Sequence, residues 1–344
     1  MAAMYVLVAA CSADEATTGT EGNAGGTAGT AAGGTGDANV GTGGSNTGGY
    51  VAGLGGTTAN LDARAAVDAD QVSDAAKPDA PTLRSAGCGK PNPPSGNLTI
   101  DVQGKTGKYV LSLPGNYQPT TAYPVGFAFH GRERTGPQCQ QGDCLGFQSV
   151  MKEHAILVYM TSLNGDGWEH VGAPNDEREI NVAFWAALRD RINNTYCVND
   201  QRVFVAGSSS GASFTNILAC RFGDKLLAAA PVAGGASTQN CKGQVAALVI
   251  HGYKDPHVPF PLGEEQRNFH ITQNHCMNKA TPSVTMVHDS VLATPESHKC
   301  AIFEGCDAGF PVVWCEHSEG GYDGSTHGWP KFGGQKIWDF VQGL

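Results

Sequence analysis

Residues 205–213 read Val-Ala-Gly-Ser-Ser-Ser-Gly-Ala-Ser, and within them Gly207, Ser209 and Gly211 complete the pattern Gly-x-Ser-x-Gly. The segment follows a short β-branched run and precedes a helical pattern. A strand that turns into a helix within a few residues needs glycine at both ends, and it places the central serine in strained backbone with an exposed hydroxyl. Of the three adjacent serines, only Ser209 has a glycine two positions away on each side. The pattern predicts that Ser209 is a nucleophile.

A serine hydroxyl is a weak nucleophile at neutral pH, so it needs an adjacent base, and the base needs an orienting carboxylate. In the chain order serine, acid, histidine, the acid should follow a later buried strand. Asp255 occupies that place, after the apolar run at 245–250. The alternative is an Asp that forms a turn before Pro256. The presence of the serine motif favours the catalytic role.

The base should lie on a loop after the last strand, where the chain offers His317 and His327. We favour His327, which has Gly328 beside it and precedes the final helical segment. His317 is too near the end of the preceding strand to reach across easily. We expect the other histidines to be structural or exposed to solvent.

Acyl transfer passes through a tetrahedral oxyanion, which backbone N–H groups must meet. One donor is the amide of Ser210, directly after the nucleophile. The second should come from the loop after the apolar run at 124–129, which reads His130-Gly131-Arg132. The sequence does not separate Arg132 from Gly131 as the donor, and Gly131 could also be an ordinary glycine that ends a strand. We also regard His130 as a candidate substrate contact.

The elements that must position these residues follow from the apolar pattern. Two alternating strands come first and may pair as a hairpin, and compact apolar runs are then separated by segments with helical period. Such an order predicts a mostly parallel central sheet sandwiched by helices, in the order of the α/β-hydrolase fold. We expect strands at 98–102, 108–113, 124–129, 155–160, 202–206, 226–232, 245–250 and 312–315, and helices at 179–196, 212–222, 263–275 and 334–341.

Residues 1–85 differ in composition from the rest of the chain. From 16 to 60 nearly every residue is Gly, Thr, Ala or Asn, so this stretch cannot bury enough apolar surface to offset its ordering entropy. We expect a flexible linker at 12–85 and one domain at 86–344. The first 85 residues carry nine acidic and three basic side chains of a chain with net charge −10. The rest of the chain therefore carries only a small net negative charge. A nucleic-acid-binding surface would need a basic face, so this charge argues against one.

Residues 1–11 are a short apolar run that ends in Val-Ala-Ala-Cys and resembles a bacterial lipobox. Cys11 is therefore a candidate site for lipidation and membrane attachment, with ordinary secretion as the alternative. No Lys or Arg precedes the run, which weakens the match. No other apolar run approaches the ~20 residues of a transmembrane helix. We expect an extracellular protein, secreted or held at the cell surface.

The ten cysteines after Cys11 all lie in the expected domain. An even, dispersed set indicates disulfides formed in an oxidising compartment. Zinc ligation is the rival explanation, but no Cys-x₂-Cys pair is present, so we predict no metal site. Spacing does not determine connectivity; Cys139 with Cys144 is the nearest local pair.

Further motifs occur in order at 87–91 (Gly-Cys-Gly-Lys-Pro), 127–132 (Phe-x-Phe-His-Gly-Arg), 196–199, 218–220 and 310–314. Together with the serine motif they resemble secreted feruloyl esterases of carbohydrate esterase family one, which are close to extracellular polyhydroxybutyrate depolymerase-like esterases. The resemblance covers residues 86–344. It implies hydrolysis of feruloyl or acetyl esters on plant cell-wall xylan without a cofactor. Ser209, Asp255 and His327 fall on the family's nucleophile, acid and base.

The resemblance also implies a substrate contact at Trp168, which matches a family tryptophan near the cleft. A ring in that place could pack against a phenolic or sugar ring. A half-buried loop anchor is the alternative. Residues 316–326 lengthen the approach to the histidine, and such loops set acyl specificity.

We therefore expect an exported, monomeric serine esterase that acts on an ester-decorated polysaccharide or a hydroxycinnamate ester. The nearest alternative is a polyhydroxybutyrate or other polyester depolymerase with the same triad. A serine peptidase and a catalytically silent carbohydrate-binding lipoprotein are further alternatives, and the latter predicts the loss of a triad residue.

Overall fold

The computed structural model describes residues 84–91, 93–168, 175–235, 241–277, 287–288, 298–318 and 325–344. Every described residue lies in one compact unit, residues 74–344. The expected lipobox-like segment at 1–11 and almost all of the expected linker at 12–85 lie outside the described residues. The described part begins at Arg84, which forms a β-bridge with Asn199.

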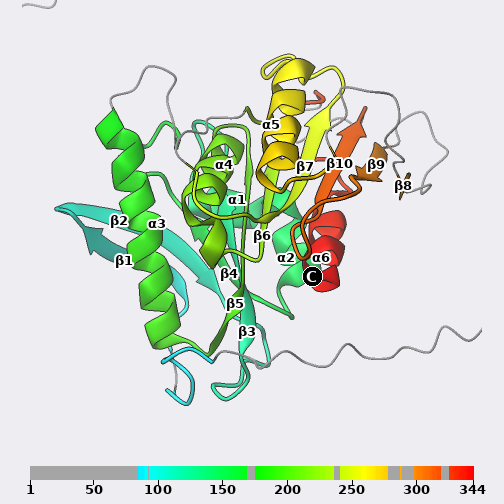
Figure 1. Ribbon diagram of the computed structural model, residues 1–344. Coiled ribbons are helices and arrows are strands. Elements are labelled where there is room, and N and C mark those ends of the chain that lie inside the picture. Colours follow the sequence, from blue (N-terminus) through cyan, green and yellow to red (C-terminus); the bar gives the residue numbers. More distant parts are fainter. Residues whose placement is uncertain are drawn as a thin grey trace, which may run out of the picture. The chain divides into compact units, whose positions relative to one another are not determined.

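One ten-stranded sheet runs through the described part of the chain, in the order β1-β2-β4-β3-β5-β6-β7-β10-β9-β8 (Figure 1). The six central strands, from β4 to β10, are parallel to one another. Antiparallel strands flank this parallel part of the sheet. The hairpin of β1 and β2 lies beside β4, and β9 and β8 lie beside β10. The strands are β1 (Gly96–Val102), β2 (Lys105–Ser112), β3 (Tyr123–Phe129), β4 (Ile156–Met160), β5 (Val198–Ser208), β6 (Ala228–Val232), β7 (Ala246–Gly252), β8 (Val287–His288), β9 (His298–Ile302) and β10 (Val312–His317).

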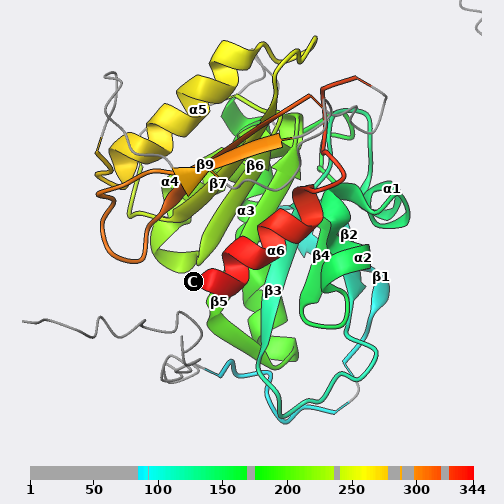
Figure 2. The same cartoon turned by 90° about the vertical axis from the view of Figure 1, so that its right-hand side faces the viewer.

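Helices cover both faces of this sheet. Helices α3, α4 and α5 lie over one face, and α1, α2 and α6 lie over the other (Figures 1 and 2). The helices are α1 (Gly136–Gln141), α2 (Phe147–Met151), α3 (Asn175–Thr195), α4 (Ser210–Phe222), α5 (Phe260–Gln273) and α6 (Gly333–Gly343), with short 3₁₀ turns at Cys144–Gly146 and Gly223–Lys225. This is the predicted α/β-hydrolase architecture.

The two-sided covering explains why the central strands read as unbroken apolar runs rather than as alternating patterns. In β3, Phe127 packs into the core beneath α3 and α4, whereas its neighbour Ala128 faces the core beneath α2 and α6. In β5, Val205 and Phe204 divide between the two cores in the same way. All four side chains are at most 1% exposed, so the centre of the sheet is rigidly packed.

All ten cysteines of the domain are paired, which confirms the disulfide framework predicted from the sequence. The nearest local pair, Cys139 with Cys144, is among them. The other four pairs are Cys88–Cys197, Cys220–Cys241, Cys276–Cys306 and Cys300–Cys315. In the described ranges, no helix is both long and apolar enough to cross a membrane. Nor do those residues contain a group of three His, Cys, Asp or Glu side chains that could hold a metal ion.

Candidate active site

The predicted catalytic residues gather where the parallel strands end. The carboxyl ends of parallel strands share one edge of a sheet, and ligands of α/β proteins bind there. Gly131 follows β3, Ser209 follows β5 and Asp255 follows β7. His327 lies on the segment between β10 and α6. The order of the strands therefore places all of these residues at one edge.

Ser209 occupies a strained turn between β5 and α4, with φ 57° and ψ −120°. A side-chain-bearing residue at positive φ costs of order 1–3 kcal/mol, and such strain is common at active sites. Both glycines of the motif are sterically required. A Cβ atom on Gly207 would overlap the carbonyl group of Gly211, and one on Gly211 would overlap the carbonyl oxygen of Phe129. Because the turn is this tight, the Ser209 side chain remains partly exposed at its apex.

The loop after β3 lies directly beside this turn. A Cβ atom added to Gly131 would lie 3.5 Å from the Cβ atom of Ser209. The β3–β5 register also places Phe129 opposite Gly207, so the two strands end at the same level. The candidate oxyanion donors of residues 131–132 and of Ser210 are thus carried by adjacent segments. Arg132 is exposed and Gly131 is partly exposed.

Asp255 and His327 form the most closely defined pair of the site. The Nδ1 atom of His327 lies 2.9 Å from Oδ1 and 2.8 Å from Oδ2 of Asp255. The carboxylate is buried, at 7% exposure for the residue, whereas the His327 side chain keeps 13% of its surface exposed. An Nδ1–H that donates to a carboxylate leaves Nε2 as the acceptor nitrogen, which is the tautomer that a general base requires.

Backbone donors hold the Asp255 carboxylate as well. The amides of His257 and Val258 donate to Oδ1 at 2.9 and 2.8 Å. Burial opposes ionisation of Asp255, but the hydrogen bonds from His327 and from these two amides outweigh it, and the net result is a lowered pKa. The acid is therefore ionised at neutral pH and can stabilise a charged imidazole.

The structure pairs Asp255 with His327 and not with His317. The His317 side chain sits at the end of β10, at 2% exposure, with its ring edge-on to Phe332. Within the described residues, no hydrogen bond joins the Ser209 hydroxyl to His327. Contacts of this kind are often long in substrate-free enzymes and tighten when substrate binds.

Both predicted substrate contacts, Trp168 and His130, are corrected by burial. Trp168 is 0% exposed, and its ring packs against Phe129 and Phe214 inside the core. His130 is 2% exposed and its ring lies against Trp168. Neither ring offers a face to a ligand. The alternative of a loop anchor describes Trp168 better, although the residue is fully rather than half buried.

The sequence did not reveal two histidines that surround the pair. His251 is fully buried, its Nε2–H donates to the carbonyl oxygen of Val258 at 2.9 Å, and the same nitrogen lies 3.7 Å from Asp255 Oδ2. Burial lowers the pKa of His251. His257 is exposed, and its ring meets that of His327 edge-on at a centroid distance of 4.9 Å. Only their closeness to Asp255 along the chain, at four and two residues, could have indicated them.

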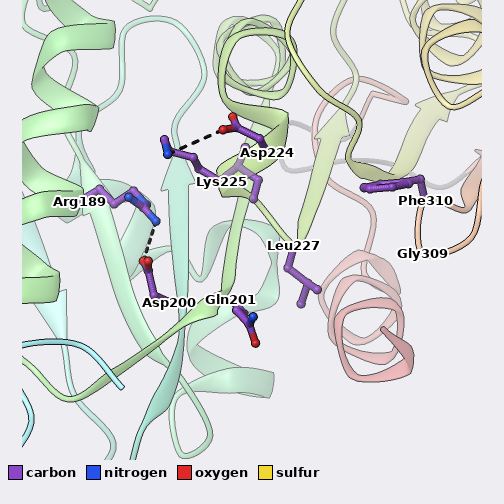
Figure 3. Close-up of a pocket in the computed structure, with 9 residues that line it drawn as sticks. Arg189, Asp200, Gln201, Asp224, Lys225, Leu227, Gly309 and Phe310 are labelled. Carbon is purple, nitrogen blue, oxygen red and sulfur yellow. Dashed lines mark hydrogen bonds and ion pairs between the residues drawn. The ribbon is translucent and has the colours of Figure 1, made fainter. Parts of the chain in front are cut away.

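A separate pocket of about 410 Å³ lies at the opposite, amino-terminal ends of the strands (Figure 3). Its charged side chains are paired with one another. Arg189 bonds to Asp200 at 2.6 Å, and Lys225 lies 3.7 Å from Asp224. The carboxyl ends of β3, β5 and β7 lie at the other edge of the sheet from this pocket, so the pocket is not part of the site built around Ser209.

The chain is similar to known proteins in sequence and in fold. No protein-family model matches the chain. It is 28% identical over 251 residues to a probable feruloyl esterase C of Aspergillus niger, covering 71% of this chain and 85% of that protein. It is 27% identical over 248 residues to feruloyl esterase D of Neurospora crassa, covering 68% of this chain and 80% of that protein.

Among solved structures, the acetyl xylan esterase from Aspergillus awamori matches 72% of this chain and 99% of its own, with a TM-score of 0.52 and 15% sequence identity. At that identity the likeness shows the fold alone. The resemblance to feruloyl esterases is confirmed by the sequence matches, and the α/β-hydrolase fold is confirmed by the structure. Together they support a carboxylic-ester hydrolase.

Proposed function

We propose that this chain is a serine esterase that cleaves feruloyl or acetyl esters of plant cell-wall xylan, with Ser209 as nucleophile, His327 as base and Asp255 as orienting acid. The observation that carries the proposal is the contact of His327 Nδ1 with both oxygens of Asp255, at the same sheet edge as the strained Ser209 turn. Such a constellation is recognised by geometry and roles rather than by fold alone.

In the first step, Nε2 of His327 takes the proton of the Ser209 hydroxyl while Oγ attacks the ester carbonyl carbon. The C=O π electrons move onto the oxygen and form a tetrahedral oxyanion. Asp255 remains ionised and stabilises the imidazolium, since its lowered pKa favours the charged form. The backbone N–H of Ser210 and that of Arg132 or Gly131 donate to the oxyanion.

Collapse of the intermediate expels the alcohol, which receives its proton from His327. The acyl group is then bonded to Ser209 Oγ. In the second half, His327 takes a proton from water as the water oxygen attacks the acyl carbon, and the released serine oxygen recovers its proton. Ester and water give acid and alcohol, and no redox partner or metal is needed in this scheme.

The substrate class comes from the relatives. The two relatives matched by sequence are named feruloyl esterases. The solved structure with a TM-score of 0.52 is named an acetyl xylan esterase. Both names describe the hydrolysis of carboxylic esters. Polyester hydrolysis, the alternative drawn from the sequence, has no observation here in its favour and serves as the comparison reaction.

We further propose that the protein works outside the cell. Five disulfides in one domain are typical of an oxidising compartment. Attachment through a lipid on Cys11, and a monomeric state, are part of the proposal. Intact mass of the protein recovered from its native host tests the lipid, since an acylated Cys11 adds the mass of its chains. Size-exclusion chromatography with light scattering tests the monomer.

The central experiment is a substrate panel with the wild type and Ser209→Ala. Methyl ferulate, acetylated xylan and a polyhydroxybutyrate emulsion are compared at equal enzyme concentration. We expect release of ferulate or acetate by the wild type and its loss in the variant. Clearing of the emulsion without release of either acid would replace the proposed substrate class, and full activity of Ser209→Ala would remove the assigned nucleophile.

A further inference from the structure

One fully buried residue, Trp168, touches both segments that carry the candidate oxyanion donors. Its backbone N–H donates to Ser210 Oγ at 2.9 Å, and its indole N–H donates to the carbonyl oxygen of His130 at 2.8 Å. Ser210 belongs to the turn of the nucleophile, and His130 begins the loop after β3. His130 and Ser210 are 80 positions apart in the sequence. Trp168 therefore connects two segments that are distant along the chain.

The approach of Trp168 to Ser210 depends on the residue before it. A Cβ atom on Gly167 would lie 2.7 Å from Ser210 Oγ, closer than such atoms approach in proteins. A second backbone bond ties the same loops, because the amide of Glu133 donates to the carbonyl oxygen of Asp166 at 3.2 Å. The loop at 165–168 is therefore held against both the β3 loop and the start of α4.

The indole ring cannot turn to relax these contacts. It is 4.8 Å from the ring of Phe214, 5.1 Å from that of Phe129 and 5.0 Å from that of His130, measured between centroids. The side-chain amide of Asn181, in α3, also donates to the carbonyl oxygen of Trp168 at 3.4 Å. A side chain packed on all sides keeps one rotamer, so its two N–H groups act as fixed points.

The His130 ring in turn fixes the peptide between Gly131 and Arg132. Its Nε2 accepts the amide proton of Ser162 at 3.2 Å, so the ring proton must sit on Nδ1, which donates to the carbonyl oxygen of Gly131 at 2.6 Å. Burial lowers the pKa of His130 to about 4, which keeps this tautomer neutral at pH 7. In a planar trans peptide the N–H of Arg132 points opposite to the Gly131 carbonyl. Holding that carbonyl therefore aims the Arg132 amide.

We propose that Trp168 and His130 form a buried clamp that sets the separation and the direction of the two oxyanion donors. Both are positioning residues, since neither reaches the reacting atoms. The proposal rests on the function proposed above, because it assigns a role to the same site. By the same peptide geometry, the bond from the Trp168 indole to the His130 carbonyl oxygen orients the Gly131 amide, so the clamp fixes the directions of both candidate donors in the loop after β3.

Donors aimed at a developing oxyanion act on the transition state and much less on the bound ester. Trp168→Phe keeps an aromatic ring in the core but removes the bond to the His130 carbonyl. We expect kcat for p-nitrophenyl acetate to fall by about 10- to 100-fold, with KM changed by less than about threefold. A substrate-contact role for Trp168 would instead raise KM.

The matched control is Trp185→Phe in α3. Trp185 is 1% exposed and belongs to the same core, but its indole nitrogen has no hydrogen-bond partner among the described residues. The same substitution there removes volume without removing a bond. We expect its kcat to stay within about twofold of the wild type. Equal losses in the two variants would show a general packing effect and overturn the clamp.

A His130 pair tests the second link. His130→Asn retains an N–H donor near the Nδ1 position, and His130→Leu does not. We expect the Asn variant to recover part of the kcat that the Leu variant loses. Equal kcat values in two folded variants would contradict the role of the Nδ1–H bond.

A readout that does not depend on esterase activity keeps the clamp separate from the proposed function. Hydrogen–deuterium exchange is followed in peptides that cover residues 129–135 and 208–212. We expect faster exchange in both peptides for Trp168→Phe and in neither for Trp185→Phe. Unchanged exchange in Trp168→Phe would overturn the clamp, whatever substrate the enzyme prefers. If the wild type released no acid from any ester while exchange followed this expectation, the function would fail and the clamp would stand.

Discussion

Gly252, at the end of β7, lies so close to Thr326 that a Cβ atom on the glycine would overlap the Thr326 carbonyl oxygen. The segment that carries His327 is thus seated directly on the strand that leads to Asp255. Since the obstacle is backbone rather than a flexible side chain, no rotamer change could make room. This contact sets the height of the base above the sheet.

Gly252→Ala should therefore shift the His327 segment away from Asp255. A misplacement of about 1 Å in a catalytic group can cost about 100-fold in rate, so we expect kcat to fall by about 10- to 100-fold. Steady-state kinetics on p-nitrophenyl acetate measures the effect. Gly235→Ala is the control, because no atom of the described residues lies within 4 Å of its added Cβ atom. A Gly252→Ala enzyme as active as Gly235→Ala would contradict the seating role.

Asp255→Asn tests the acid. An amide in this place would donate to Nδ1 of His327 and force the ring proton onto Nε2, where it blocks removal of the serine proton. We expect kcat to fall by about 10³- to 10⁴-fold, with little change in KM.

A second carboxylate and histidine pair supplies the control for this test. Asp307 lies 2.7 Å from His275, but both side chains are largely exposed; Asp307 precedes β10, and His275 follows α5 rather than the end of a strand. Asp307→Asn should leave kcat unchanged. The acid assignment would be wrong if the two substitutions had the same effect on kcat.

The disulfides should differ in their effect on stability. Cys88–Cys197 closes 109 residues, and Cys139–Cys144 closes only 5. In the chain-entropy description, loops of these lengths are worth about 5 and about 2 kcal/mol. Replacing both cysteines of a pair by serine should lower the free energy of unfolding by these amounts, as measured by urea denaturation. A larger loss for the short loop would show that native packing around the bond, and not loop entropy, dominates.

Acid should destabilise the fold through its buried histidines. Burial lowers the pKa of His130 to about 4 and that of His270 to about 3. In the unfolded chain both titrate near 6.5, so below that pH the unfolded state takes up protons that the native state does not, and stability falls as pH falls. Between pH 7 and pH 5 we expect a loss of about 2 kcal/mol for each histidine.

Urea denaturation at several pH values measures this slope. His270→Gln removes one titrating ring while keeping an amide near the Asn216 oxygen, which His270 Nε2 contacts at 3.0 Å. The variant should lose less stability than the wild type between pH 7 and pH 5. The same acid-side slope in both proteins would show that His270 does not titrate differently on unfolding.

The order of strands and helices was predictable because each depends on local pattern. The expected helix at 179–196 is α3, and the expected strand at 202–206 is the end of β5. The prediction missed β9 (His298–Ile302), which pairs antiparallel with β10. It is short and begins with two polar residues, so it shows no clear alternation. The short helices α1 and α2 were missed for a similar reason, since five or six residues give no helical period.

The candidate site was predictable where chemistry imposes a chain order. The serine motif around Ser209, Asp255 and His327 follow that order, and the structure brings the acid and the histidine together. The side-chain directions of Trp168 and His130 were not predictable. An aromatic ring after a glycine-rich loop can face solvent or core, and only contacts with residues more than 30 positions away decide between them.

By itself, then, the sequence determined the fold class, the disulfide-rich domain and the residue types of an acyl-transfer site. These follow from composition, from period and from the steric needs of one tight turn, all of which act over a few residues. The tertiary structure decided which histidine meets Asp255, how the cysteines pair and that Trp168 lies inside the core. Each of these depends on distances between segments far apart in the chain, and such distances are set by the packing of both faces of the sheet.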